Sequence, residues 1–324
     1  MDLLSTAQGC DAVRYRPGDN QGHYESYFQR ANHPDRPLAF WIRYTIFSPR
    51  GQPGAAVGQL WAIYSDGETG KITTAKDVFP IERCRFSPDG LDVTIADATL
   101  SDGLLAGSAS GTDGCVAWDL RFEGDQEPLL LLPRKFYDGG FPKAKSLVGI
   151  PNAHFSGRLV VGDQEVDIND WVGSQNHNWG KRHTDHYAWG QVAGFDNDPG
   201  AFLELSTARV RFGPVWTPFL TFVVLRVGGQ TYALNGLRRA LLARAHFNNS
   251  HWDFLTGDAN TSIEGRIEAP AETFVTLRYD NPPGGHKTCL NSKLASCQLT
   301  LRRAGMEPLT RHTWSRAAFE ILSD

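Results

Sequence analysis

Short segments in which apolar and polar residues alternate recur along most of this chain. Residues 23–30 (HYESYFQR) alternate strictly, and residues 38–47 (LAFWIRYTIF) are rich in aromatic and β-branched side chains, the composition of a β-strand. Turn pairs such as Asp66-Gly67 separate such segments at short intervals. The pattern predicts an all-β protein made of antiparallel barrels or sandwiches.

Further strands are expected on both sides of a loop at residues 136–145 that is rich in Gly and Pro. They are expected at residues 58–65, 71–79, 84–87, 92–100, 104–110, 115–122, 152–161, 164–168, 201–212, 216–227, 230–234, 246–255, 262–269, 273–279 and 294–303. Only residues 236–245 (GLRRALLARA) have helical spacing, with leucines on one side and arginines on the other. This organisation predicts an N-terminal arm over residues 1–20, a first β domain over 21–150 and a second over 151–324.

Composition restricts the class of protein and of partner. The chain has 324 residues, 41% of them hydrophobic and 21% charged, as in a globular protein. Its net charge of −4, without a basic block, argues against nucleic acid as a partner. The apolar run at residues 129–132 is closed by Pro133, and no run is long enough to cross a bilayer. Composition does not determine the oligomeric state.

The cysteines and the N-terminus bear on localisation. The chain has five cysteines, an odd number without a CxxC pair, which is typical neither of a disulfide framework nor of a zinc knuckle. The first ten residues (MDLLSTAQGC) lack the basic and apolar regions of a signal peptide. We therefore expect a cytoplasmic protein.

Polar and aromatic side chains are densest in residues 170–195 (DWVGSQNHNWGKRHTDHYAWGQVAGF). At the end of this stretch, alternation places Tyr187, Trp189 and Gln191 on one face of a strand. A face that carries two polar-tipped aromatic rings and an amide is suited to line a pocket. The alternative is that these rings belong to an ordinary core, which is the commoner use of a tryptophan.

Residues 155–191 carry a family resemblance. A strand that starts with Ser-Gly, a hairpin, an HNWG motif and a Trp-containing strand follow one another, and the matching residues are Gly157, His177, Asn178, Trp179, Gly180, Trp189 and Gly190. This segment resembles the hydroxyneurosporene synthase (carotenoid 1,2-hydratase) family, with its AttH-like, tocopherol cyclase and fungal Diels–Alderase relatives. The resemblance implies two lipocalin-like barrels in tandem, with a hydrophobic ligand bound in or between them and no organic cofactor.

The resemblance also implies a type of chemistry. In such enzymes an acid protonates an alkene, and water or an internal nucleophile quenches the cation; Diels–Alderase relatives mainly fold the substrate into a reactive shape. The hydratases tend to carry Asp before the HNWG motif, where this chain has Asn176. An amide cannot act as a general acid, although it can orient a substrate through hydrogen bonds.

Two glutamates in expected strands have a structural and a functional interpretation. Glu25 and Arg43 lie on neighbouring strands, and they either form an ion pair inside the first barrel or place a charge in its pocket. A buried Glu with a raised pKa would be a proton donor. Glu204 (in AFLELSTARV) has the same two interpretations.

Metal and nucleotide sites are not expected. The spacing of His177, His183 and His186 matches no common zinc pattern, and no cysteine lies nearby. We expect His177 to form hydrogen bonds at the barrel mouth, and His183 to lie in a solvated loop. The chain also lacks a P-loop, a dinucleotide fingerprint and a GxSxG motif, so no cofactor is expected.

These observations predict a site at the junction of the two domains. The expected catalytic residues are Asn176, His177 and Glu25, and the expected substrate-binding residues are Trp41, Arg43, Trp179, Tyr187, Trp189, Gln191 and Glu204. One hypothesis is a cofactor-independent cyclase, isomerase or hydratase that acts on an apolar terpenoid, polyene or polyketide. The alternative is a lipocalin-like carrier of such a molecule without chemistry. A buried carboxyl group with only one partner would favour the enzyme.

Overall fold

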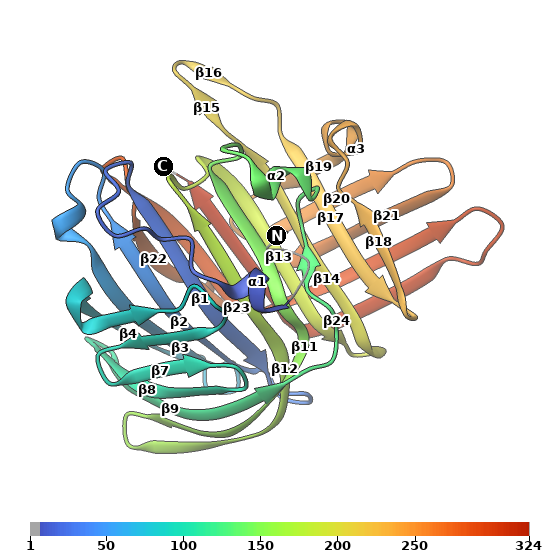
Figure 1. Cartoon of the computed structure of the whole chain (residues 1–324). Coiled ribbons are helices and arrows are strands. Elements are labelled where there is room, and N and C mark those ends of the chain that lie inside the picture. Colours follow the sequence, from blue (N-terminus) through green and yellow to red (C-terminus); the bar gives the residue numbers. More distant parts are fainter. Residues whose placement is uncertain (1–6, 324) are drawn as a thin grey trace. The chain divides into compact units, whose positions relative to one another are not determined.

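The computed structural model describes residues 7–323, which form mainly antiparallel β-structure (Figure 1). The chain divides into two compact units. Unit 1 takes in the chain up to Leu129, Phe141–His183 and Asp280–Gly285, and unit 2 takes in Leu130–Gly140, Thr184–Tyr279 and the chain from His286. Each unit contains one large antiparallel sheet, which confirms the all-β prediction. Among the described residues, no helix is both long and apolar enough to cross a membrane.

Unit 1 is built on a sheet of twelve strands with the order β4-β3-β2-β1-β12-β11-β9-β8-β7-β6-β5, with β10 paired to β11. The strands are β1 (His23–Asn32), β2 (Leu38–Ser48), β3 (Val57–Asp66), β4 (Lys71–Pro80), β5 (Cys84–Phe86), β6 (Asp92–Ile95), β7 (Ala98–Ser101), β8 (Leu104–Gly111), β9 (Gly114–Glu123), β10 (Leu129–Leu130), β11 (Ala144–Val161) and β12 (Gln164–Gly180). A short helix, α1 (Ala7–Asp11), precedes them.

The sheet of unit 1 curls until its two ends approach each other. β4 packs against β8 and β9, and the Ser110 backbone N–H donates a hydrogen bond to Asp77 Oδ2 at 2.9 Å. The interior of this nearly closed barrel is filled by alternate side chains of each strand, such as Tyr27, Phe40 and Trp171. Burial of this apolar face stabilises the curled sheet.

Unit 2 is built on a sheet of ten strands with the order β18-β17-β14-β13-β24-β23-β21-β20-β19, with β22 paired to β23. The strands are β13 (His186–Phe195), β14 (Asp198–Arg209), β17 (Leu220–Val227), β18 (Gln230–Leu234), β19 (Arg244–Phe247), β20 (His251–Gly257), β21 (Thr261–Glu268), β22 (Val275–Asp280), β23 (His286–Arg303) and β24 (Leu309–Ser323). Its core includes Val192, Leu203, Trp252 and Phe319.

Three smaller elements complete unit 2. The strands β15 (Arg211–Phe212) and β16 (Val215–Trp216) form a separate hairpin, and α2 (Lys135–Asp138) is a single turn. The helix α3 (Leu237–Leu242) follows β18, contacts both β17 and β20, and buries Ala240. It therefore bridges β17 and β20, each of which is next to an end strand of the sheet.

The expected boundary at residues 150 and 151 does not coincide with the division into units. β12 pairs with β1 from Tyr24↔Gly180 to Asn32↔Val172, so the hairpin of β11 and β12 belongs to the sheet of unit 1. The Gly- and Pro-rich loop does separate two trains of strands along the chain. However, the partner of a strand is fixed by side-chain packing at long range, which local composition does not reveal.

Several element bounds also differ from the sequence prediction. The segment 92–100 is interrupted by a turn with Ala96 at φ 51°, and the segment 246–255 is divided between β19 and β20. β12 continues to Gly180, past the expected end at Ile168. The expected arm is in part α1 and in part buried; its first six residues lie outside the described part of the chain.

We predict that Gly173→Ala destabilises unit 1. A Cβ atom at Gly173 in β12 would overlap the carbonyl oxygen of Arg30 and the backbone of Ala31, so adjacent strands would have to separate. Overpacking of this kind costs about 1–3 kcal/mol or more. Chemical denaturation should show the loss. Gly200→Ala in β14 is the control, because its nearest atom is 3.7 Å away and no neighbour has to move; equal stability of the two variants would contradict the prediction.

Candidate functional site

The Glu25 carboxylate lies in the interior of the unit 1 barrel and accepts hydrogen bonds from several donors. The backbone N–H groups of Arg14 and Tyr15 donate at 2.8 and 2.7 Å, and His23 Nε2 lies 2.8 Å from Oε2. His177 Nε2 lies 2.8 Å from Oε1. Every one of these groups has hydrogen to donate, so the site favours a negative carboxylate.

His177 is completely buried between two acceptors. Its Nδ1 lies 2.8 Å from the carbonyl oxygen of Cys10, and its Nε2 faces Glu25. A carbonyl oxygen can only accept, so Nδ1 carries the hydrogen of that bond, and Nε2 faces the Glu25 carboxylate. The ring stacks on Tyr27 at 4.3 Å between centroids and lies 4.7 Å from the Trp179 ring.

These contacts decide the protonation of Glu25. Burial is the largest single influence and raises its pKa, but the hydrogen bonds from His177 and His23 and the charges of these two rings outweigh burial and lower the pKa to about 2. Glu25 is therefore an ionised acceptor at neutral pH. It is a poor proton donor, in contrast to one of the two interpretations of the sequence.

The same network fixes the N-terminal segment. Cys10, Asp11, Arg14 and Tyr15 all lie on it, and Gln175 Nε2 donates to Asp11 Oδ1 at 3.0 Å. Burial raises the pKa of Asp11 to about 6, although the charge of His177 and the Gln175 hydrogen bond oppose that rise. The burial of Asp11 was not predicted, because nothing in an irregular N-terminal stretch indicates it.

Strand alternation separates the residues that the sequence grouped in unit 1. Glu25, His177 and Trp179 point into the barrel, whereas Asn176 is on the opposite face of β12 and Arg43 is on the matching face of β2. Phe28 pairs with both Asn176 and Arg43, which puts these three in one row. Asn176 and His177 therefore face different surroundings.

The side chains on that opposite face have other partners than those expected. Asn176 Nδ2 donates to Ser174 Oγ at 2.8 Å, and the Arg43 guanidinium lies 5.8 Å from the Trp41 ring centroid. The expected ion pair between Glu25 and Arg43 does not form, because the two side chains lie on opposite faces of the sheet.

Glu204 in unit 2 has surroundings unlike those of Glu25. It lies on β14 on the face away from the core and is buried. Trp189 Nε1 donates to its Oε1 at 3.1 Å, and its Oε2 has no hydrogen-bond partner among the described residues. Burial raises its pKa to about 8, and the Trp189 hydrogen bond opposes this only in part. Glu204 is therefore a protonated carboxyl group at neutral pH.

Glu204 belongs to a buried polar cluster on this face. Gln191 pairs directly with Glu204 across β13 and β14, and Tyr187, on the same face of β13, is half-buried at its end. On the other side of Trp189, the Lys293 ammonium lies 5.6 Å from the indole centroid and 2.8 Å from Glu320 Oε1. We call Trp189, Gln191, Glu204, Lys293 and Glu320 the Glu204 cluster. The chain thus places one aromatic ring between a neutral acid and a buried ion pair.

Trp189, Gln191 and Glu204 were among the binding residues expected from the sequence, whereas Lys293 and Glu320 were not. The expected strand began at residue 294, whereas β23 begins at His286, so Lys293 was not assigned to any face. A signal was present, since Asn291 and Lys293 have the i, i+2 spacing of one strand face.

The three histidines of the dense stretch have different environments. His177 holds Glu25, His183 is buried and stacks on Tyr24 at 4.0 Å, and His186 contacts Phe219 and Phe247. His183 is thus not in the solvated loop that the sequence predicted. In the described part of the chain, no group of three or more His, Cys, Asp or Glu side chains could hold a metal ion.

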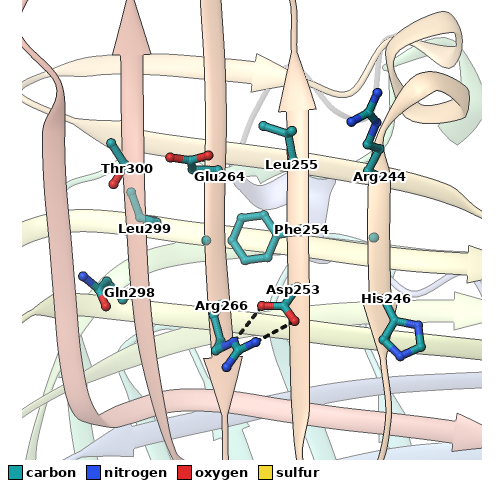
Figure 2. A pocket seen from close by; sticks show the side chains of 12 residues that line it. Arg244, His246, Asp253, Phe254, Leu255, Glu264, Arg266, Gln298, Leu299 and Thr300 are labelled. Atoms are coloured by element: carbon teal, nitrogen blue, oxygen red, sulfur yellow. Dashed lines mark hydrogen bonds and ion pairs between the residues drawn. The ribbon is translucent and has the colours of Figure 1, made fainter.

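A shallow groove of about 560 Å³ lies on β19, β20, β21 and β23 (Figure 2). Two of its carboxylates are engaged: Asp253 forms a two-bond ion pair with Arg266, at 2.6 and 2.9 Å, and Glu264 pairs with Arg302. The Arg266 hydrogen bond lowers the pKa of Asp253, so it is ionised. Both of these carboxylates are thus ion-paired at the surface, unlike the buried Glu204.

Comparisons of sequence identify distant relatives only. No family model matches the chain. Two uncharacterised proteins of Mycobacterium tuberculosis, from strains CDC 1551 and H37Rv, are each 27% identical over 198 residues. The match covers 59% of this chain and 57% of each relative, so it spans little more than half their length.

Comparisons of structure show a shared fold. A candidate AttH from Nitrosomonas europaea has a TM-score of 0.58 at 14% identity, covering 97% of both chains. Kievitone hydratase from Nectria haematococca has a TM-score of 0.57 at 12% identity, covering 94% of this chain and 89% of its own. CghA in its complex with Sch210972 has a TM-score of 0.56 at 11% identity, covering 100% and 97%. The chain therefore has the fold of these proteins.

We predict that Asp11→Asn stabilises the protein at neutral pH and not at acidic pH. Asp11 has a folded-state pKa of about 6, above the ordinary value of 3.8. Its contribution to stability is therefore present below pH 3.8 and is lost as the pH rises through 6. Asparagine keeps an oxygen for Gln175 and does not ionise. The gain in the free energy of unfolding should grow between pH 4 and pH 7, by up to about 3 kcal/mol.

Denaturant unfolding at a series of pH values measures this difference. Asp97→Asn, at an exposed aspartate of the same unit, is the matched control and should follow the wild type. If the gain in the free energy of unfolding does not change between pH 4 and pH 7, the pKa of Asp11 is not raised in the folded protein, and the prediction is wrong.

Proposed function

We propose that this chain is a cofactor-independent, redox-neutral enzyme of the hydratase, cyclase or isomerase type, with an apolar terpenoid, polyene or polyketide as substrate and Glu204 as proton donor. One observation carries the proposal: Glu204 is buried, has Trp189 as its one hydrogen-bond partner among the described residues, and has a pKa of about 8. A carboxyl group kept neutral near pH 7 is suited to general acid catalysis.

The hydrogen bond from Trp189 determines where the proton lies. Nε1–H can only donate, so Oε1 of Glu204 accepts from it and the carboxyl proton belongs to Oε2. Oε2 is the oxygen without a partner, and it is therefore the one from which a proton can be transferred. Trp189 would therefore position the acid, and its ring would also form an apolar wall of the site.

The proposed reaction is balanced without a redox step. The Oε2–H bond breaks, a carbon–hydrogen bond forms at one alkene carbon, and the π-electron pair moves into that bond. The cation left on the other carbon is stabilised by the Trp189 ring face. It is then attacked by water, by an internal hydroxyl group or by an internal double bond, and the last two close a ring. In each route the resulting oxonium ion or ring carbocation loses a proton to the Glu204 carboxylate, which restores the acid and leaves a neutral product.

Other members of the Glu204 cluster would orient the substrate. The Gln191 amide on β13, which pairs with Glu204 on β14, can bind one oxygen of an otherwise apolar molecule. Lys293 is held by Glu320 beside Trp189. The sequence expectation that residues of both halves of the chain border one pocket stays a prediction.

We further propose that the chain is a distant member of the hydroxyneurosporene synthase-like group. The HNWG motif at residues 177–180 supports this, as does a fold shared with a candidate AttH and with a protein named as a hydratase. In this chain, His177 of the motif binds Glu25 and the N-terminal segment, which favours a positioning role for the motif. The acid would then come from Glu204 instead of the position of Asn176.

A carrier without chemistry is the second candidate function. The observation that favours it is that Glu25 and His177, which the sequence placed among catalytic residues, are engaged with each other and with the backbone. A carrier needs an apolar pocket but no proton donor. Glu204 would then be a passive neutral group.

Glu204→Gln tests the proposal. The substitution keeps the shape and the bond from Trp189 but removes the transferable proton. Purified protein is incubated with a panel of acyclic polyenes in D₂O, and mass spectrometry measures deuterium incorporated at carbon. We expect incorporation by the wild type and a loss of about 100-fold or more in the variant. Incorporation should also fall above pH 8, where Glu204 ionises.

Glu264→Gln is the matched control, because Glu264 is an exposed, ion-paired glutamate of the same unit. It should leave incorporation unchanged. If Glu204→Gln incorporates deuterium as the wild type does, Glu204 is not the acid. If native mass spectrometry shows a bound polyene that neither protein converts, the carrier function is correct.

A further inference from the structure

One long segment of unit 2 carries only positive charge. From Leu205 to Trp252 the chain has no Asp and no Glu but six arginines, although the whole chain has a net charge of −4. The segment includes the hairpin of β15 and β16 and the helix α3. A charge asymmetry of this size within an acidic protein indicates a preference for an anionic partner.

The hairpin of β15 and β16 exposes apolar side chains at its tip. Phe212 and Val215 are 61% and 64% exposed, on either side of the Gly213-Pro214 turn. Figure 1 shows this hairpin standing away from the large sheet of its unit. Apolar side chains at the end of a projecting hairpin gain little from the fold, since nothing described covers them.

Cationic and aromatic side chains stiffen the base of this hairpin. The Arg209 guanidinium lies 4.3 Å from the Trp216 ring centroid and 4.6 Å from that of Phe219. Arg211 Nε donates to the Gly213 carbonyl oxygen at 2.9 Å. These contacts hold the tip in one orientation, with charge next to the apolar residues.

The helix α3 extends from the same end of the sheet as the hairpin. The hairpin comes immediately before β17, and α3 comes immediately after β18. These two strands are antiparallel, with Val223 paired to Leu234, so the start of β17 lies beside the end of β18. α3 exposes Leu241 and Leu242 by 52% and 68%.

Arginines whose guanidinium groups form no ion pair among the described residues accompany both apolar groups, although the Arg211 backbone N–H donates to Asp185 Oδ2 at 2.8 Å. Arg211 on the hairpin, Arg238 in α3 and Arg244 at the start of β19, two residues past α3, are exposed, and among the described residues none of their guanidinium groups forms an ion pair. Arg239 differs, because it pairs with Asp258. The cationic groups at this end of the unit are thus largely uncompensated.

We propose that the hairpin tip and the exposed side of α3 form a docking surface for an anionic lipid bilayer. Phe212, Val215, Leu241 and Leu242 would enter the acyl boundary, while the unpaired arginines bind headgroup phosphates and Trp216 lies at the interface. Charge complementarity and the apolar tip both favour a bilayer over neutral partners. The proposal does not depend on the enzymatic function, although a bilayer would supply apolar substrates.

Sedimentation with vesicles tests this surface. The probes are vesicles of phosphatidylcholine alone and of phosphatidylcholine with phosphatidylglycerol, at low and at high salt. We expect the wild type to sediment with the anionic vesicles only, and less at high salt. The triple variant R211Q/R238Q/R244Q should lose roughly 100-fold in the partition coefficient, at about fivefold per arginine. F212S/V215S and L241S/L242S should each bind the anionic vesicles more weakly than the wild type does.

Two controls carry the same chemical changes elsewhere. R36Q/R85Q/R266Q removes three exposed arginines that are ion-paired, and so reaches the same net charge, and Trp314→Ser removes a 76% exposed aromatic side chain. Both should bind as the wild type does. The arginine variants keep the test valid if a serine variant fails to fold, as judged by circular dichroism.

Three results would overturn the proposal. The first is a wild type that does not sediment with anionic vesicles; self-association through the hairpin in that case would identify a protein interface instead. The second is equal binding to neutral vesicles. The third is an equal loss of binding in R36Q/R85Q/R266Q and R211Q/R238Q/R244Q, which would reduce the effect to net charge alone.

Discussion

A carboxyl group that is removed from water is either ionised and surrounded by donors or protonated and left with few partners. This protein contains one carboxyl group of each kind, Glu25 in unit 1 and Glu204 in unit 2. Glu25 receives backbone and imidazole hydrogen bonds from three parts of the chain, and they hold its pKa at about 2. Glu204 receives one indole hydrogen bond, and burial raises its pKa to about 8. The number of donors that reach each oxygen separates a structural carboxylate from a candidate acid.

The Glu25 network explains how the barrel of unit 1 accommodates an N-terminal segment that has no strand of its own. The segment cannot join the sheet, so its backbone groups need other partners. His177 donates to the carbonyl of Cys10, and Glu25 accepts from the N–H groups of Arg14 and Tyr15. The HNWG motif, from which the family resemblance arises, thereby has a stabilising role in this chain. Removal of His177 would take one of the main hydrogen-bond partners from the buried Glu25 carboxylate, which is more costly than the loss of a hydrogen bond at the surface.

In unit 2 the core and the candidate site share the same strands. Alternate residues of β13 and β14, such as Val192 and Leu203, fill the core, and the residues between them, such as Gln191 and Glu204, lie on the other face. A rigid core on one side therefore fixes the positions of the polar side chains on the other. The peripheral elements of this unit, the β15–β16 hairpin and α3, leave apolar side chains exposed, although α3 buries Ala240. The proposed acid and the proposed docking surface thus lie on different elements of unit 2.

The sequence alone determined the all-β class, most strand positions and the alternation that gives each strand two faces, because these follow from local steric preference and the two-residue period. Alternation also put Trp189 and Gln191 on one strand face, whereas the pairing of Gln191 with Glu204 across β13 and β14 came only from the structure. Only the tertiary structure decided that β11 and β12 belong to unit 1, that Asn176 and His177 face apart in different surroundings, and that Asp11, Lys293 and Glu320 are buried. These facts depend on contacts between residues far apart in the chain. A pKa is set by burial and by the donors within reach, and neither can be read from the order of residues.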